Sequence, residues 1–115
     1  MEFTDSLKLN YAFRRAYRKG RSAAEPCHVV YARRNGKAGN RLGFTVSNKL
    51  GCAVVRNRVR RRQREIYRLN ESRLCRGHDV VVVARSRSVG ADYQRLEREF
   101  LRACAELGLV KESET

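Results

Sequence analysis

The sequence has little negative charge, one proline, no tryptophan and no long apolar segment. Asp and Glu together number 12 against 26 Lys and Arg, which gives the 115 residues a net charge of +14. A membrane helix needs about 20 apolar residues, and no run approaches that length. The first residues lack the cationic start and apolar stretch of a signal peptide, so we expect a cytoplasmic protein. The length allows one domain with a real core.

Cysteine pairs with metal-ligand spacing are also missing. No C-x-x-C motif occurs. The four cysteines are far apart in the sequence, at Cys27, Cys52, Cys75 and Cys104. Neither His28 nor His78 completes a zinc pattern with them. We expect free thiols in a reducing cytosol and no metal site, although an even number of cysteines would permit two disulfides.

The most informative stretch is residues 56–68, which contains seven arginines and only one acidic residue. Good helix formers and the lack of Pro or Gly after Gly51 predict a helix from about Cys52 to about Leu69. At about 100° per residue, its apolar face carries Val55, Val59, Ile66 and Leu69. The opposite face carries Asn57, Arg60, Arg61, Arg64 and Arg68. Arg62 falls within the apolar stripe, where its stem could run along the core with its charge in water.

This cationic face indicates a partner rather than simple exposure to water. Arg60 and Arg64 lie four residues apart, as do Arg64 and Arg68, and like charges at this spacing repel. A solvated helix usually mixes charges of both signs. We therefore expect an anionic partner, with nucleic acid as the first candidate and an anionic membrane surface as the second.

Hydrophobic periodicity predicts the remaining elements. They are a helix at 10–19, strands at 28–33, 41–47 and 79–85, and a final helix at 92–107. The first two strands are joined by a short turn and should pair antiparallel. The valine-rich third strand should be central and covered on both faces. The order α-β-β-α-β-α predicts one α+β domain over residues 1–115, with flexible ends at 1–9 and 109–115.

Two aromatic residues of the first helix have two possible roles. Phe13 and Tyr17 recur at helical spacing beside Ala12 and Ala16, which is typical of core residues. The same pair could also form a platform on which unpaired bases stack. Spacing alone favours the core.

The chain resembles the bacterial ribonuclease P protein component. The residues that carry the resemblance are Arg56-Asn57-Arg58 followed by Val59-Arg60-Arg61, preceded by Ser47, Lys49, Gly51, Ala53 and Val54. The likeness extends to the first helix, Tyr31, Gly43 and the strand starting at Asp79. Two departures are Asn48, where lysine is common, and Arg62, where leucine is frequent.

The resemblance implies a subunit of the ribonucleoprotein endonuclease that removes the 5′ leader of precursor tRNA. Catalysis and its Mg²⁺ ions would belong to the RNA subunit, with one protein per RNA and no cofactor on the protein. RNA-binding residues would be Lys49, Arg56, Asn57, Arg58, Arg60, Arg61, Arg64 and Arg68. The leader would lie in a cleft between the first helix and the sheet, against Phe13, Tyr17 and Tyr31. The fold would be ribosomal-protein-S5-domain-2-like, with a left-handed β-α-β crossover, against the general rule.

Parts of the sequence are also compatible with three other functions. The first is a ribosomal or general RNA-binding module without an enzymatic partner. The second is a nuclease acting alone, which the positions of His28 and His78, at a strand start and in a loop, do not favour. The third is a basic membrane-surface protein, which the scarcity of aliphatic residues on the cationic helix argues against.

Overall fold

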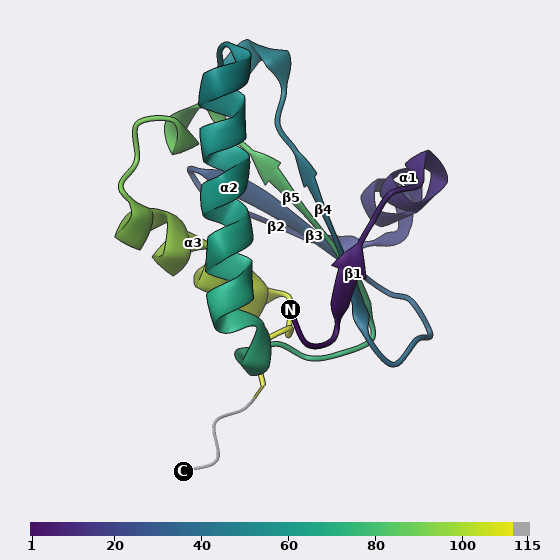
Figure 1. Ribbon diagram of the computed structural model, residues 1–115. Helices are drawn as coiled ribbons and strands as arrows, with labels where there is room; N and C mark the ends of the chain where they lie inside the picture. The colour runs from purple at the N-terminus through teal and green to yellow at the C-terminus, as the bar shows by residue number, and fades with distance from the viewer. Residues whose placement is uncertain (112–115) are drawn as a thin grey trace.

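The computed structural model describes residues 1–111 as a five-stranded sheet with three α-helices (Figure 1). The strands are β1 Thr4–Ser6, β2 Arg21–Ala24, β3 His28–Arg34, β4 Asn40–Thr45 and β5 His78–Ala84. The helices are α1 Asn10–Lys19, α2 Ala53–Asn70 and α3 Tyr93–Glu106. Short 3-10 turns lie at η1 Asn48–Leu50, η2 Glu71–Arg73 and η3 Ser86–Ser88. No helix in residues 1–111 is long and apolar enough to cross a bilayer.

Strand β5 lies at the centre of the sheet, as its run of valines predicts. The strand order is β1-β4-β5-β3-β2, with β5 parallel to β4 and antiparallel to β3. The expected antiparallel pairing of β3 with β4 is therefore wrong, because β5 inserts between them. The apolar run Val80–Val82 is almost fully buried and needs a strand on each side and cover on both faces.

The connection from β4 through α2 to β5 is left-handed. In Figure 1, α2 lies in front of the sheet, β4 and β5 both run upward, and β5 lies to the left of β4. A right-handed crossover would place β5 on the other side of β4. The left-handed crossover implied by the resemblance is confirmed.

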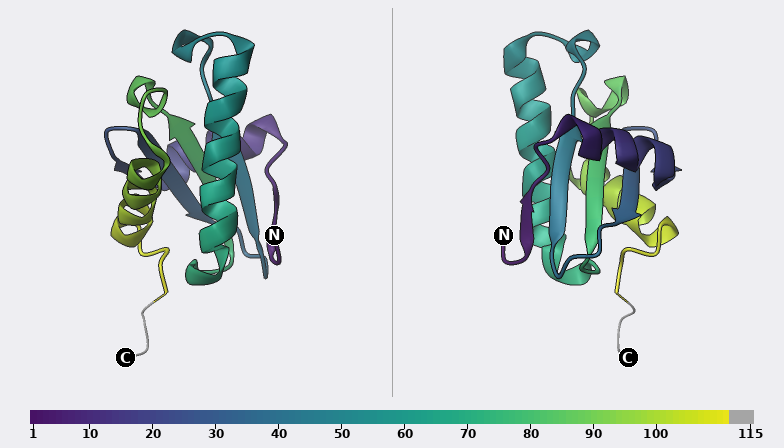
Figure 2. Two further views of the ribbon diagram at one scale, coloured as in Figure 1. Left: turned by 60° about the vertical axis from the view of Figure 1, so that its left-hand side comes forward. Right: turned by 90° about the vertical axis from the view of Figure 1, so that its right-hand side faces the viewer.

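The two faces of the sheet carry separate layers of core (Figure 2). Helices α2 and α3 cover one face, where Ile66, Tyr67, Leu96 and Phe100 pack against the even-numbered residues Val80 and Val82 of β5 and their neighbours. Helix α1 covers the other face, where Leu7, Ala12 and Ala16 pack against Val81. The period-2 alternation of a strand accounts for this division.

Two segments before β3 for which no helix or strand was predicted each contain a strand. Residues 1–9, expected to be a flexible arm, contain β1, which pairs in parallel with β4. The hydroxyl groups of Thr4 and Tyr67 are 2.8 Å apart, and Glu71 accepts a hydrogen bond from the backbone of Glu2. Residues 21–26, expected to be a loop, contain β2, which pairs with β3. These polar links between distant residues leave no periodic signal in the sequence.

The C-terminal end of the chain agrees only in part with the expected tail. Asp92 caps α3 by accepting a hydrogen bond from the backbone of Arg95, and Gly108 follows the helix with φ +73°. However, Leu109 is buried and Val110 bridges to Leu74. The rest of the predicted tail, residues 112–115, lies outside the described residues.

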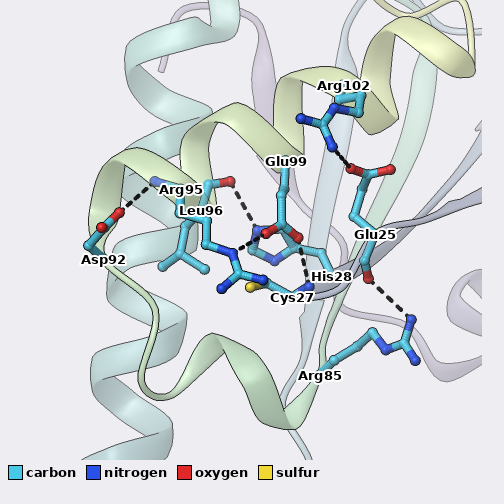
Figure 3. A network of polar contacts seen from close by, with 9 residues as sticks. All are labelled: Glu25, Cys27, His28, Arg85, Asp92, Arg95, Leu96, Glu99 and Arg102. Carbon is cyan, nitrogen blue, oxygen red and sulfur yellow. Dashed lines mark hydrogen bonds and ion pairs between the residues drawn. The ribbon is translucent and has the colours of Figure 1, made fainter.

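A buried polar network joins α3 to the start of β3 (Figure 3). The Glu99 carboxylate accepts hydrogen bonds from the backbone N–H of Cys27 and from Nε of Arg95, at 2.7 and 2.8 Å. Burial raises the pKa of Glu99, but these donors outweigh burial, and the net pKa lies below its ordinary value. Satisfied in this way, a buried carboxylate holds α3 in one position on the sheet.

A second buried carboxylate, Asp79, organises the lower end of the sheet. Arg41 donates two hydrogen bonds to it at 2.8 and 2.7 Å, and Asn35 donates a third at 3.1 Å. Burial raises the pKa of Asp79, but these donors lower it more, so the net pKa lies below its ordinary value. The group therefore stabilises the fold above its unfolded-state pKa, and this contribution disappears as pH falls through the folded-state pKa.

Replacing this carboxylate should destabilise the protein in a pH-dependent way. Asp79→Asn should lower the free energy of unfolding at pH 7 by roughly 3 kcal/mol, because Arg41 loses its partner. The deficit should begin to shrink below about pH 4, where Asp79 of the unfolded parent takes up a proton, and should vanish at the lower pH where the folded parent does so too. Urea unfolding at several pH values measures both effects. The exposed Glu106→Gln is the control, and an equal deficit at pH 7 and pH 3 would contradict the assignment.

Candidate nucleic-acid interface

Helix α2 is amphipathic, and its buried face fixes the direction in which its arginines point. Val59, Gln63, Ile66 and Tyr67 are each at most 3% exposed. Leu69, expected on the apolar face, is instead 54% exposed, because the helix turns it away from the sheet. Packing of the buried face holds a helix whose charges would otherwise repel one another.

The exposed face of α2 presents a group of arginines to solvent. Four of them are exposed and make no ion pair with an acidic residue of the described chain: Arg58, Arg60, Arg61 and Arg64. The side-chain Oδ1 of Asn57 accepts a hydrogen bond from Nη1 of Arg60 at 3.2 Å. An arginine fork without a carboxylate partner can bind phosphate through two parallel hydrogen bonds.

Asn48, the departure from the expected lysine, positions a neighbouring arginine. Its side-chain oxygen accepts a hydrogen bond from Nη1 of Arg56 at 2.6 Å, across the turn between η1 and α2. Lys49 beside it is exposed, and its backbone N–H is capped by Ser47. Compared with a lysine, Asn48 therefore lacks one positive charge, but its side chain orients the guanidinium group of Arg56.

Two further arginines of α2, Arg68 and Arg62, also make contacts within the chain. Arg68 forms an ion pair with Glu65 at 2.5 Å, and this contact lowers the pKa of Glu65. Both side chains are about half exposed, so RNA could displace the pair at little cost. Arg62 is half-buried, and its Nη1 donates a hydrogen bond to the carbonyl of Ala91, 3.1 Å away, which links α2 to the loop before α3.

The three predicted leader-binding aromatic residues share the α1 face of the sheet. The rings of Tyr17 and Tyr31 meet edge to face, 4.9 Å between centroids, and the Tyr17 hydroxyl lies 2.6 Å from that of Thr45. Phe13 packs against the same cluster and is half-buried. A Cβ on Gly43 would lie 2.5 Å from Cζ of Phe13, so the absence of a side chain there lets the ring rest on the strand.

A cleft joins Phe13 to the arginine helix. It lies at the β1–β4 edge of the sheet, has a volume of about 380 Å³, and is lined by Phe13 and Gly43 on one side and by Arg60 and Arg64 on the other. Tyr17 and Tyr31 do not line it. Sequence reasoning missed the β1 residues that complete the wall, Thr4, Asp5 and Ser6, because that segment gave no strand signal.

The two histidines differ in their surroundings: His28 is buried with both ring nitrogens engaged, and His78 is half-buried. The ring nitrogens of His28 lie 3.0 Å from the Gln63 amide and 3.1 Å from the carbonyl oxygen of Leu96, and burial lowers its pKa. Burial also lowers the pKa of the half-buried His78. Within residues 1–111, no three His, Cys, Asp or Glu side chains come close enough to hold a metal ion.

Comparison with known proteins decides between the remaining interpretations. A sequence model of the family Ribonuclease P matches residues 1–108. The chain belongs to the ribonuclease P protein family. The ribonuclease P protein component of Natranaerobius thermophilus is 41% identical over 108 residues, covering 94% of each chain. That of Alkaliphilus metalliredigens is 40% identical over 110 residues, covering 96% of this chain and 99% of the relative.

Solved structures of the family have the same fold. The ribonuclease P protein of Staphylococcus aureus superposes with a TM-score of 0.84 at 30% identity, covering 95% of this chain and 98% of that one. The Thermotoga maritima protein gives 0.78 at 31% identity, covering 85% and 93%. The chain is thus a protein subunit of the endoribonuclease ribonuclease P and associates with ribonuclease P RNA. A general RNA-binding module without an enzymatic partner is excluded.

The close contact between the Phe13 ring and Gly43 can be tested by substitution. In Gly43→Ala, the new methyl group should displace the ring, changing the NMR shifts of Leu7 and costing about 1 kcal/mol of stability. Gly90→Ala is the matched control, since a Cβ there has no neighbour within 4 Å. Unchanged Leu7 shifts in Gly43→Ala would contradict the close contact between ring and strand.

Proposed function

We propose that the protein holds the 5′ leader of precursor tRNA in the β1–β4 cleft while the arginine face of α2 binds ribonuclease P RNA. The single observation that carries the proposal is the joint lining of the cleft by Phe13, Arg60 and Arg64. An aromatic ring and two guanidinium groups suit the base and the phosphates of one unpaired strand.

The aromatic wall suits substrates of many sequences. Stacking contributes about 1–3 kcal/mol per base and tolerates any base, because every base has a flat face. Phe13 offers such a surface in the cleft, and the Tyr17–Tyr31 pair continues it along the α1 face of the sheet. A subunit that serves many different precursors needs this kind of sequence-independent contact.

The arginine face of α2 suits a folded RNA. Arg58, Arg61 and the exposed arginines beside them would neutralise phosphates and release counterions, so binding should weaken steeply with salt. Lys49, Arg56 and Asn57 would extend this contact around the start of the helix. In this proposal one protein binds one RNA in the cytoplasm, and the Mg²⁺ required for cleavage is held by the RNA subunit.

Loss of the aromatic surface should weaken binding of the leader selectively. In a holoenzyme reconstituted with bacterial ribonuclease P RNA, Phe13→Leu with Tyr17→Leu should reduce affinity for precursor tRNA about tenfold or more. The same variant should leave affinity for mature tRNA nearly unchanged, because mature tRNA has no leader to stack. Equilibrium binding of both tRNAs measures the difference.

Tyr11→Leu is the control for this experiment. Tyr11 is an exposed aromatic residue on the same helix, outside the cleft, and Arg15 lies over its ring. The Tyr11→Leu variant should bind precursor tRNA and mature tRNA as tightly as the parent does. Equal losses for precursor and mature tRNA in the Phe13/Tyr17 variant would show that these residues act only in the core.

A further inference from the structure

A second cationic surface lies at the end of the sheet where β2 and β5 begin and β3 ends. Two adjoining hollows, which share Arg21, Arg34, His78 and Leu107, open beside the ends of β2 and β3. Together they are lined by six basic residues and by no Asp or Glu: Lys19, Arg21, Arg33, Arg34, Lys37 and Arg76. We call these six residues the distal basic surface.

The charges of the distal basic surface are not neutralised within the described chain. None of its six residues forms an ion pair with a carboxylate of residues 1–111. The nearest buried acid, Asp79, is already engaged by Arg41 and Asn35. So many like charges gathered in one hollow repel one another unless an anion enters it.

The frame of this surface is fixed by hydrogen bonds between two loops. The backbone N–H of Asn35 donates to the carbonyl of Gly77 at 2.9 Å, and the Asn35 side chain bonds both Gly39 and Asp79. Arg76 lies over the ring of Phe3, 4.4 Å from its centroid. The cations are therefore held on a preformed support, which lowers the entropy lost when a ligand binds.

The lining indicates which part of an RNA would fit. No Phe, Tyr or Trp is among the lining residues, so the hollows offer no surface for stacking unpaired bases. They are also poor in the apolar side chains of small-molecule pockets. Cations without aromatic residues suit the phosphate backbone of a structured RNA, whose bases are paired and turned away.

We propose that the distal basic surface binds the phosphate backbone of a second, structured segment of ribonuclease P RNA. Three strand spacings separate β4 from β2 in the order β4-β5-β3-β2, or about 14 Å. Arg34 pairs with His78 at the end of the sheet where β5 begins, whereas the turn that leads into α2 follows the other end of β4. The protein thus bridges two segments of its RNA subunit, and this contact does not depend on the leader cleft proposed above.

The test measures binding of the full chain to ribonuclease P RNA alone, without tRNA. Arg34→Gln with Lys37→Gln removes two exposed charges whose side chains form no ion pair with a carboxylate of residues 1–111. The slope of log affinity against log salt should become shallower by roughly 1.8 for two lost phosphate contacts. The ratio of parent affinity to variant affinity should accordingly fall about tenfold between 50 and 200 mM salt. Arg98→Gln with Arg102→Gln on α3 removes the same charge and should leave the slope unchanged.

Lysine footprinting gives a readout that needs no variant. Acetylation of Lys19 and Lys37, followed by mass spectrometry, should be slowed several-fold when the RNA subunit is bound. Unchanged acetylation or an unchanged slope would overturn the proposal. So would a slope change of equal size in the α3 variant, which would reflect net charge alone. If the Arg34/Lys37 variant lost affinity only for precursor tRNA, the surface would contact substrate, and the proposal would be wrong.

Discussion

The burial of one face of α2 against the sheet is the constraint on which the rest of the structure depends. A free helix with seven arginines between residues 56 and 68 would be opposed by its own charge. Ile66 and Tyr67 in the core, with Gln63 bonded to His28, hold it in place. The arginines are therefore arranged before RNA arrives, and less conformational entropy is lost on binding.

The left-handed crossover determines where α2 lies relative to the cleft. It places α2 over the part of the sheet where β4 pairs with β1, and the β1 segment leads directly into α1. Arg60 and Arg64 of α2 thereby meet Phe13 of α1 in one cleft, although they are about fifty residues apart in sequence. The cleft and the distal basic surface differ in the side chains that line them. The cleft combines an aromatic ring with cations, whereas the distal basic surface has cations alone.

Much of this architecture could be predicted from local patterns, and the failures have identifiable causes. The helical periods of α1, α2 and α3 and the valines of β5 were sufficient to place those elements within a residue or two. Strand β1 was missed because polar links to Tyr67 and Glu71 hold it, and such links leave no periodicity. The pairing of β3 with β4 was wrong because local turn length cannot reveal that a later strand inserts between them. The arginine face was evident from charge alone, but the ion pair of Arg68 and the hydrogen bond of Arg62 depend on tertiary contacts.

The most direct measurement is the salt dependence of ribonuclease P RNA binding by Arg58→Ala with Arg61→Ala, compared with Arg98→Ala with Arg102→Ala on α3. If the arginines of α2 meet phosphates, the first variant should bind more weakly and its slope should be shallower by roughly 1.4–1.8, while the second should match the parent. An unchanged slope in the first variant, or an equal change in both, would contradict the role of α2 as the RNA-docking helix.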